Sequence, residues 1–208
     1  MDGTMLDNMQ FHLQAWQKIV AEAGSDMKGD EMFKQLYGKN TEILTRILGS
    51  EKFSPAEIKQ MADRKDAFYR ELYAPEIRLL PGLMEFLTEA KKQNVLLAIA
   101  SATLDKSVQF AIDALGIRSF FKVIISGSDV KISKPDPETF LKAAEGLDVL
   151  PIDCIVFEDV PKGVEAAQRA AMTAVVVLTS HKKEDFDPFS NVIKTITDYR
   201  SINVKELL

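Results

Sequence analysis

Four short runs of apolar residues in the second half of the chain constrain its fold most strongly. They alternate with amphipathic segments, and they are VLLAIA at 95–100, VII at 123–125, CIVFE at 154–158 and AVVVL at 174–178. An apolar run without polar alternation is typical of a strand covered on both faces, and helices between such strands form right-handed parallel βαβ units. The pattern therefore predicts an α/β fold with a Rossmann-like parallel sheet.

The stretch from about Met9 to Tyr73 has a different pattern, in which apolar residues recur at helical spacing. A helix start is marked at SPAE, where Ser54 is the expected N-cap, Pro55 takes the first helical position and Glu57 completes a capping box. We expect that helix to run to about Leu72. The two patterns together predict an α/β core at 1–8 and 77–208, with an all-helical insert at 9–76.

Composition excludes several classes of partner. The formal net charge is −5, with 26 Lys and Arg scattered among 31 acidic residues, which argues against a nucleic acid or a membrane surface as partner. The single cysteine, Cys154, allows no internal disulfide, and its apolar neighbours predict a small buried core residue. No apolar stretch is long enough to span a membrane and no secretory leader pattern opens the chain, so we expect a cytoplasmic protein.

Polar clusters follow the predicted strands, at the edge where ligands bind in open α/β sheets. In IASATLDKS, Ser101 and Thr103 precede a helix expected from near Leu104, whose N-terminus attracts anions. In SKPDPETF, Lys134 is followed by Pro135 and is suited to act as a point charge for a phosphate. The structural alternatives are a helix cap for the two hydroxyl residues and a solvated surface position for the lysine.

Two adjacent acids, Glu158 and Asp159, end the apolar run CIVF. Adjacent carboxylates at the end of a buried strand repel each other and need a cation, and hard oxygen ligands favour Mg²⁺. The alternative is that these acids cap the helix expected at PKGVEAAQRA.

The order of these features resembles the haloacid dehalogenase superfamily, and more narrowly its branch of β-phosphoglucomutase-like proteins and sugar-phosphate phosphatases with a helical cap. The resemblance rests on an Asp-Gly-Thr turn, a helical insert, a strand ending in Ser, a Lys-Pro before a helix and a strand ending in Glu-Asp. The segments FHLQAW, SKPDPETF and FEDVPKGVEAA are similar to that branch, and the resemblance extends over essentially the whole chain.

The resemblance implies roles for individual residues. The family's first motif reads Asp-x-Asp-Gly-Thr, in which the first Asp is the nucleophile that becomes a phosphoaspartate and the second is the general acid and base. Asp2 matches the second Asp, whose backbone carbonyl also corresponds to a Mg²⁺ ligand. Ser101 and Lys134 match the phosphate-binding positions, and Glu158 with Asp159 matches the metal-binding acids.

Further residues match substrate contacts. His12 is similar to a histidine of the cap linker that touches substrate in the mutase, Lys65 aligns with a cap lysine of similar role, and Thr103 is a further substrate-binding candidate. The alternatives are a packing histidine for His12 and a solvated helix face for Lys65 and for Lys39. His181, in TSHKK, is expected in a surface loop.

The sequence favours one function over two others. We expect a Mg²⁺-dependent phosphomonoester phosphatase acting on a small phosphorylated metabolite such as a sugar phosphate, with a monomeric chain and no nucleic-acid or membrane partner. A β-phosphoglucomutase-like phosphomutase is the first alternative, but GKNTEIL offers residues 39–41 where the mutase carries an arginine for the distal phosphate. A chain that binds phosphate or metal without turnover is the second.

The opening MDGTMLDN raises a separate expectation. The family pattern places the nucleophilic Asp one residue before Met1, at the end of a first strand in the middle of the sheet. We therefore expect the native protein to begin several residues earlier. The 208-residue chain is expected to retain phosphate and Mg²⁺ sites and to be close to inactive.

Overall fold

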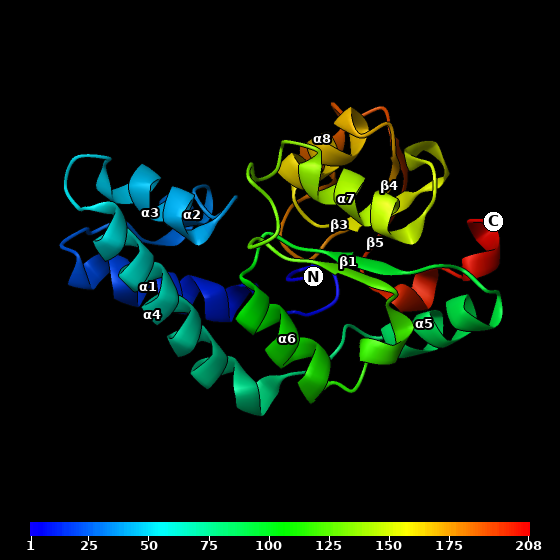
Figure 1. Ribbon diagram of the computed structural model, residues 1–208, viewed down its shortest axis with the longest axis horizontal. Helices are drawn as coiled ribbons and strands as arrows, with labels where there is room; N and C mark the ends of the chain where they lie inside the picture. Colours follow the sequence, from blue (N-terminus) through cyan, green and yellow to red (C-terminus); the bar gives the residue numbers. More distant parts are fainter. The chain divides into compact units, whose positions relative to one another are not determined.

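The computed structural model describes residues 1–208, which form two compact units (Figure 1). One unit combines Met1–Asp7 with Arg78–Leu208, and the other is the continuous segment Asn8–Ile77. The second unit is entirely helical, whereas the first alternates strands and helices.

Four helices build the helical unit: α1 at Met9–Glu22, α2 at Gly29–Phe33, α3 at Asn40–Leu48 and α4 at Pro55–Tyr73. Their buried faces form one core, made of Trp16, Ile19, Val20, Met32, Ile43, Leu44, Ile58 and Ala62. The start of α4 is confirmed: Ser54 accepts a hydrogen bond from the backbone N–H of Glu57, and the Glu57 side chain returns to the backbone of Ser54. The helix ends at Tyr73, one residue beyond the predicted end.

The α/β unit contains the remaining longer helices and all the strands. The helices are α5 at Leu83–Lys92, α6 at Asp105–Ala114, α7 at Glu138–Leu147 and α8 at Pro161–Arg169. The strands are β1 at Ala98–Ala100, β2 at Val123–Ile125, β3 at Ile155–Glu158, β4 at Thr173–Val177 and β5 at Val192–Ile196. Short 3-10 turns occupy Ala74–Glu76, Arg118–Phe120, Pro151–Asp153, Lys183–Phe186, Tyr199–Ser201 and Val204–Glu206.

The α/β Rossmann-like fold is confirmed, but its parallel strands form two sheets. One sheet pairs β1 with β2, and the other has the order β3-β4-β5. All four predicted apolar runs contain a strand, although the first run forms a ladder only from Ala98 onward. Strand β5 was not predicted, because Lys194 and Thr195 interrupt the sequence VIKTI, which is therefore not a continuous apolar run.

The N-terminal turn is fixed within the α/β unit at the carboxyl ends of the strands. Leu6 forms bridges with Asp2 and Leu79, and the backbone N–H of Leu80 donates to the carbonyl of Met5 at 2.8 Å. The hydroxyl of Tyr199 donates to the carbonyl of Thr4 at 3.0 Å. Hydrogen bonds from Thr103 to Asp2 and from Thr4 to Asp159 place residues 2–4 next to the polar loops that follow β1 and β3. None of the helices combines the length and the apolar character needed to cross a membrane.

Candidate active site

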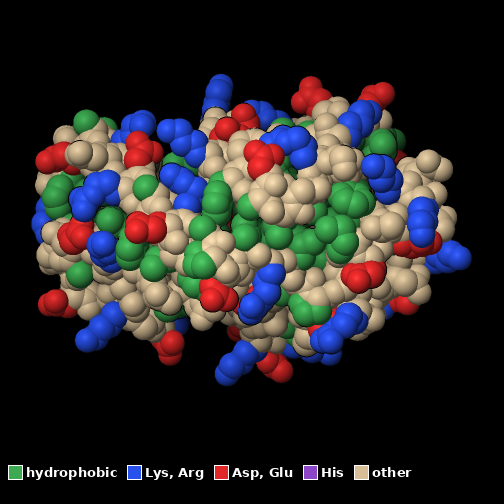
Figure 2. Space-filling view, turned by 90° about the horizontal axis from the view of Figure 1, so that it is seen from below, with side chains coloured by type: hydrophobic (Ala, Val, Ile, Leu, Met, Phe, Trp, Pro, Cys, Tyr) green, Lys and Arg blue, Asp and Glu red, His purple; other side chains and the backbone are tan.

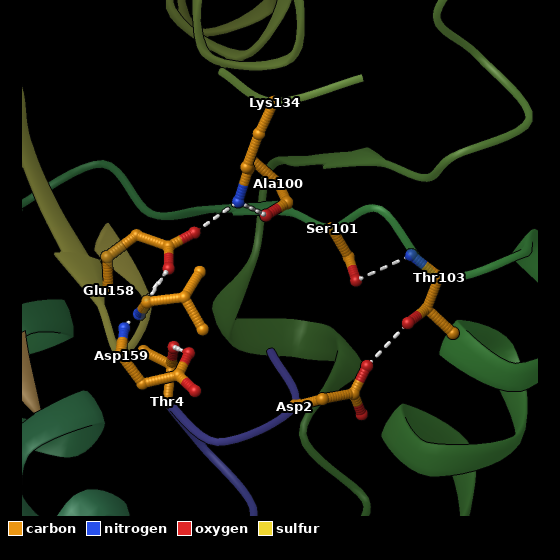
Figure 3. Close-up of polar contacts among 9 residues, drawn as sticks. Asp2, Thr4, Ala100, Ser101, Thr103, Lys134, Glu158 and Asp159 are labelled. Carbon is orange, nitrogen blue, oxygen red and sulfur yellow. Dashed lines mark hydrogen bonds and ion pairs between the residues drawn. The ribbon is translucent and has the colours of Figure 1, made fainter. Parts of the chain in front are cut away.

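A glycine turn brings Asp159 against the N-terminus. Gly3 has a φ of +65°, and a Cβ atom at this position would lie 1.9 Å from Oδ2 of Asp159. Thr4 Oγ1 donates to Asp159 Oδ1 at 2.9 Å, and Ser180 Oγ donates to Asp159 Oδ2 at 2.8 Å. Only glycine permits both this backbone conformation and this approach, so the Asp-Gly-Thr turn and the second acid of Glu-Asp form one structural element (Figure 3).

Lys134 and Glu158 form a buried ion pair. Only 9% of the surface of Lys134 and 5% of that of Glu158 are exposed, so the solvated position considered for Lys134 is wrong. The ammonium group also donates to the carbonyl of Ala100 at 3.4 Å, at the end of β1 (Figure 3). A Cβ atom on Gly163 would lie 2.1 Å from the Glu158 carboxyl carbon, so α8 begins directly against this acid.

The two adjacent acids differ in their electrostatics. Burial is the largest single effect on Glu158 and raises its pKa, but the charges of Lys134 and of the N-terminal ammonium, with hydrogen bonds from Lys134 and the backbone of Val160, together hold that pKa below its ordinary value. Burial, and then the charge of Glu158, raise the pKa of Asp159 to about 7, although the N-terminal ammonium and hydrogen bonds from Ser180 and Thr4 lower it. Asp159 is therefore the acid of the pair that an added cation would stabilise most.

The loop after β1 connects Ser101, Thr103 and Asp2. Ser101 is buried, and its Oγ accepts a hydrogen bond from the backbone N–H of Thr103 at 3.2 Å, so part of its role is to close this loop. The hydroxyl of Thr103 donates to the carboxylate of Asp2 (Figure 3). Gly127 packs on the same loop, because a Cβ there would lie 2.1 Å from the carbonyl of Ala102. Thr103 thus orients Asp2 within the site.

The candidate residues fall into two groups, one in each unit. Six of them surround the carboxyl ends of β1 and β3 in the α/β unit, and they are Asp2, Ser101, Thr103, Lys134, Glu158 and Asp159. His12 and Lys65 belong to the helical unit and lie together there, with Nζ of Lys65 2.7 Å from Nδ1 of His12.

The helical-unit group is buried and polar. Lys65 is 1% exposed, so a solvated helix face is the wrong description for this residue. Its ammonium lies 3.2 Å from Oδ1 of Asp66, and the same oxygen accepts a hydrogen bond from Asn40 Nδ2 at 2.8 Å. His12 stacks on Tyr69 at 3.8 Å between ring centroids, so a packing role for His12 holds beside any contact with substrate. Through its hydrogen bond to Asp66, Asn40 connects residues 39–41 with His12 and Lys65.

Several site residues were not predicted from the sequence. Ser180 holds Asp159, yet only the neighbouring His181 was singled out in TSHKK, where the same rule of polar residues after an apolar strand would have identified the serine. His181 is half-buried and its pKa is lowered by burial, so its predicted place in a surface loop is only partly right. Asp66 gave no signal, because neighbouring residues in a helix usually face different directions.

The three predicted metal ligands do not form a cage of carboxylates. No group of three or more His, Cys, Asp and Glu side chains lies close enough together to hold a metal ion. The side chain of Asp2 bonds to Thr103 and that of Glu158 pairs with Lys134, whereas the Asp159 carboxylate accepts hydrogen bonds from the hydroxyls of Thr4 and Ser180. Mg²⁺ usually keeps several waters and takes one or two carboxylates, so Asp159 fits a magnesium anchor of that kind.

Known proteins resemble this chain over its whole length. The family model of the haloacid dehalogenase-like hydrolases matches residues 1–177. The chain is 30% identical over 208 residues to the chloroplastic 5-amino-6-(5-phospho-D-ribitylamino)uracil phosphatase of Arabidopsis thaliana, covering 99% of this chain and 56% of that protein, or about half its length. It is 34% identical over 185 residues to the β-phosphoglucomutase of Bacillus subtilis, covering 85% of this chain and 80% of that one.

A solved structure shows the same fold. The family IA, variant 3 HAD hydrolase of Entamoeba histolytica is 25% identical and has a TM-score of 0.88, covering 100% of this chain and 94% of that chain. The match includes the helical segment as well as the α/β unit, since the whole chain is covered.

Proposed function

Because this chain belongs to the haloacid dehalogenase-like hydrolases, we propose that its α/β unit is the phosphoryl-transfer site of a Mg²⁺-dependent phosphatase for small phosphate esters such as sugar phosphates. The observation that carries the proposal is the buried cluster at the carboxyl ends of β1 and β3. In this cluster the ammonium of Lys134, the hydroxyl of Ser101 and the carboxyl of Asp159, whose pKa is raised, lie at one edge of the unit. The proposal includes a monomeric, cytoplasmic enzyme.

Each group has a role that follows from its chemistry. A phosphoryl group in transfer spreads negative charge over its oxygens, so fixed cations and hydrogen-bond donors provide most of the catalysis. Lys134 would supply the fixed positive charge and Ser101 a hydroxyl donor. Glu158 positions the ammonium, because the ion pair is buried and the acid is held against Gly163.

Asp2 and Asp159 divide the remaining tasks. Asp2 is the candidate general acid and base, and the Thr103 hydroxyl would keep its carboxyl oriented toward the leaving oxygen. Asp159 and the backbone carbonyl of Asp2 would hold Mg²⁺. When bound, that ion would neutralise charge on the transferred phosphoryl group.

A phosphomutase is the second candidate function, and the observation favouring it is the 34% identity to a β-phosphoglucomutase. Against it, residues 39–41 contain no arginine, and the side chain of Asn40 is already bonded to Asp66. β-Glucose 1-phosphate separates the two functions, because a mutase would convert it to glucose 6-phosphate and a phosphatase would release inorganic phosphate.

The decisive experiment measures binding before turnover. Inorganic phosphate and glucose 6-phosphate are titrated into the chain with and without Mg²⁺ by isothermal calorimetry, and phosphate release is then followed over a panel of phosphate esters. Lys134→Ala should weaken phosphate binding at least about tenfold, since it removes a charge-assisted contact. Lys131→Ala, three residues earlier and exposed, is the matched control and should bind as the unmodified chain does. Equal phosphate affinity in both variants would refute the assignment of the site.

A further inference from the structure

A side chain of α7 holds the loop at residues 126–134, which connects β2 with α7. Oε2 of Glu138 accepts hydrogen bonds from two consecutive backbone N–H groups, that of Lys131 at 2.8 Å and that of Ile132 at 2.9 Å. A carboxylate bound by successive N–H groups forms charge-assisted hydrogen bonds, which fix the backbone at that point. Lys134 follows Ile132 by two positions. The contact therefore fixes the backbone immediately before the lysine of the candidate site.

Lys142 holds the same loop from the next turn of α7. Its Nζ lies 2.9 Å from Oε1 of Glu138 and donates to the backbone carbonyl of Asp129 at 2.5 Å. Hydrogen bonds from the backbone of Ile132 and then from Lys142 lower the pKa of Glu138 to about 2. Glu138 is therefore ionised at neutral pH, and two side chains one helical turn apart bind the loop backbone at positions 129, 131 and 132.

The position of the Lys134 ammonium depends on this loop. Nζ contacts the carboxylate of Glu158 and the carbonyl of Ala100 (Figure 3), and it lies 4.4 Å from the ring centroid of Phe140. Because a lysine side chain is a flexible stem, these contacts are kept only while the backbone of Lys134 stays in place. Figure 2 shows Lys and Arg side chains interspersed with Asp and Glu on one face of the molecule. That face therefore presents no broad positive field that could replace a single fixed ammonium.

We propose that Glu138 is a positioning residue for phosphate binding, because its hydrogen bonds to the loop backbone keep the Lys134 ammonium where it meets a phosphate group. The inference rests on the proposed function, since Lys134 has to be the lysine that binds phosphate. The expected direction is opposite to that of a simple charge effect. Removing a negative charge near an anion site strengthens anion binding by Coulomb's law, whereas loss of the Glu138 contact should weaken it.

Three replacements of Glu138 separate its reach from its charge. In Glu138→Gln the amide carbonyl can accept both backbone N–H groups, because a single oxygen accepts both in the structure, but the ion pair with Lys142 is lost. Glu138→Asp keeps the charge on a side chain that is one methylene shorter, and Glu138→Ala removes both charge and reach. Glu145→Ala is the matched control, because it removes one negative charge from an exposed position of the same helix.

Inorganic phosphate is titrated into each variant of the full chain by isothermal calorimetry, below the melting temperature measured for that variant. Glu138→Ala and Glu138→Asp should each weaken phosphate binding about tenfold, as loss of a hydrogen bond to a charged group does. Glu138→Gln should stay within about threefold of the unmodified chain, since the neutral amide still accepts both bonds, and Glu145→Ala should bind as the unmodified chain does. Hydrogen exchange followed by mass spectrometry should be faster over residues 129–134 in the alanine and aspartate variants only.

A double-mutant cycle separates positioning from a general loss of stability. Because Glu138 acts through Lys134, Glu138→Ala should weaken phosphate binding no further in a chain that already carries Lys134→Ala. Unchanged or tighter phosphate binding by Glu138→Ala, a glutamine variant as weak as the alanine variant, or additive effects of the two alanine replacements would overturn the inference. If Lys134→Ala alone leaves phosphate binding unchanged, the proposed function fails and this inference with it; if Lys134→Ala weakens binding and Glu138→Ala does not, only the inference fails.

Discussion

Replacing Lys134 by methionine should destabilise the α/β unit strongly, because it leaves a buried charge without its partner. The side chains of Lys134 and Glu158 are 10% and 7% exposed and form an ion pair at the end of β3. Removing one partner of such a pair costs about 3–5 kcal/mol. A domain is typically stable by roughly 5–15 kcal/mol, so this single change removes a large part of the total.

The magnitude can be separated from that of an ordinary lysine replacement. Lys162 pairs with Glu165 at 2.9 Å on α8, but the lysine side chain is 46% exposed. An exposed pair contributes about 0–1 kcal/mol, so Lys162→Met is the matched control. Urea unfolding at neutral pH, followed by circular dichroism, measures both variants.

The pH dependence gives the sign of the effect. In the unmodified chain the pKa of Glu158 is held below its ordinary 4.5, so its ionised form stabilises the fold above that pH and this stability is lost as the pH falls through the lowered pKa. Without Lys134, burial raises the Glu158 pKa instead. The Lys134→Met variant should therefore regain stability as the pH is lowered from neutral, and Lys134→Met combined with Glu158→Gln should regain it at neutral pH. Equal losses in Lys134→Met and Lys162→Met would refute this reasoning.

Three further predictions concern the turn and the second acid. Gly3→Ala should lower the melting temperature, because an alanine with positive φ costs about 1–2 kcal/mol and its Cβ would displace the Asp159 carboxylate. Gly116→Ala is the control, since Gly116 has the same φ but open space around it. Equal shifts of the melting temperature in the two variants would disprove the close contact between Gly3 and Asp159 as the cause. Mg²⁺ at ten times its Kd should stabilise the chain by about 1.4 kcal/mol, and Asp159→Asn should remove this gain in a thermal melt, whereas an unchanged gain would place the metal elsewhere. Without Mg²⁺, the free energy of unfolding should fall as the pH rises from about 4 through 7, because the folded state binds a proton at Asp159 more tightly than the unfolded chain, whose carboxyl has a pKa of 3.8. In the Asp159→Asn variant the free energy of unfolding should change less over this pH range. A variant curve parallel to that of the unmodified chain would contradict the prediction.

The sequence predicted those parts of the fold that local physics determines. The start of α4 follows from Ser54, Pro55 and Glu57 alone, because a capping box involves only residues three apart. The four apolar runs predicted β1 to β4 because a strand buried on both faces needs an unbroken apolar run. Strand β5 carries a lysine at position 194 and lacks that signal.

Contacts between distant segments could not be predicted in the same way. Polar residues after strands indicated Lys134 and Glu158 separately, but 24 residues separate them and only the strand order brings them together. Ala98 and Val156 are both typical of a buried strand, and nothing local to either one shows that β1 and β3 are left unpaired with each other. Cys154 was predicted to be buried and is half-exposed for the same reason, since it lies at the cavity between the sheets.

The two motif glycines explain why the acid pair lies where it does. Gly3 leaves no room for a Cβ beside Asp159, and Gly163 leaves none beside Glu158, so each acid is packed against backbone on a different side. Their carboxylates therefore face different partners, Glu158 the Lys134 ammonium and Asp159 the hydroxyls of Thr4 and Ser180. Two adjacent acids that packing separates in this way titrate in different ranges, because the Lys134 ammonium contacts Glu158, whereas burial and the charge of Glu158 dominate at Asp159. The opening Asp-Gly-Thr therefore contributes to the site in two ways: Asp2 provides a carboxyl group, and Gly3, which has no Cβ, leaves room for the Asp159 carboxylate.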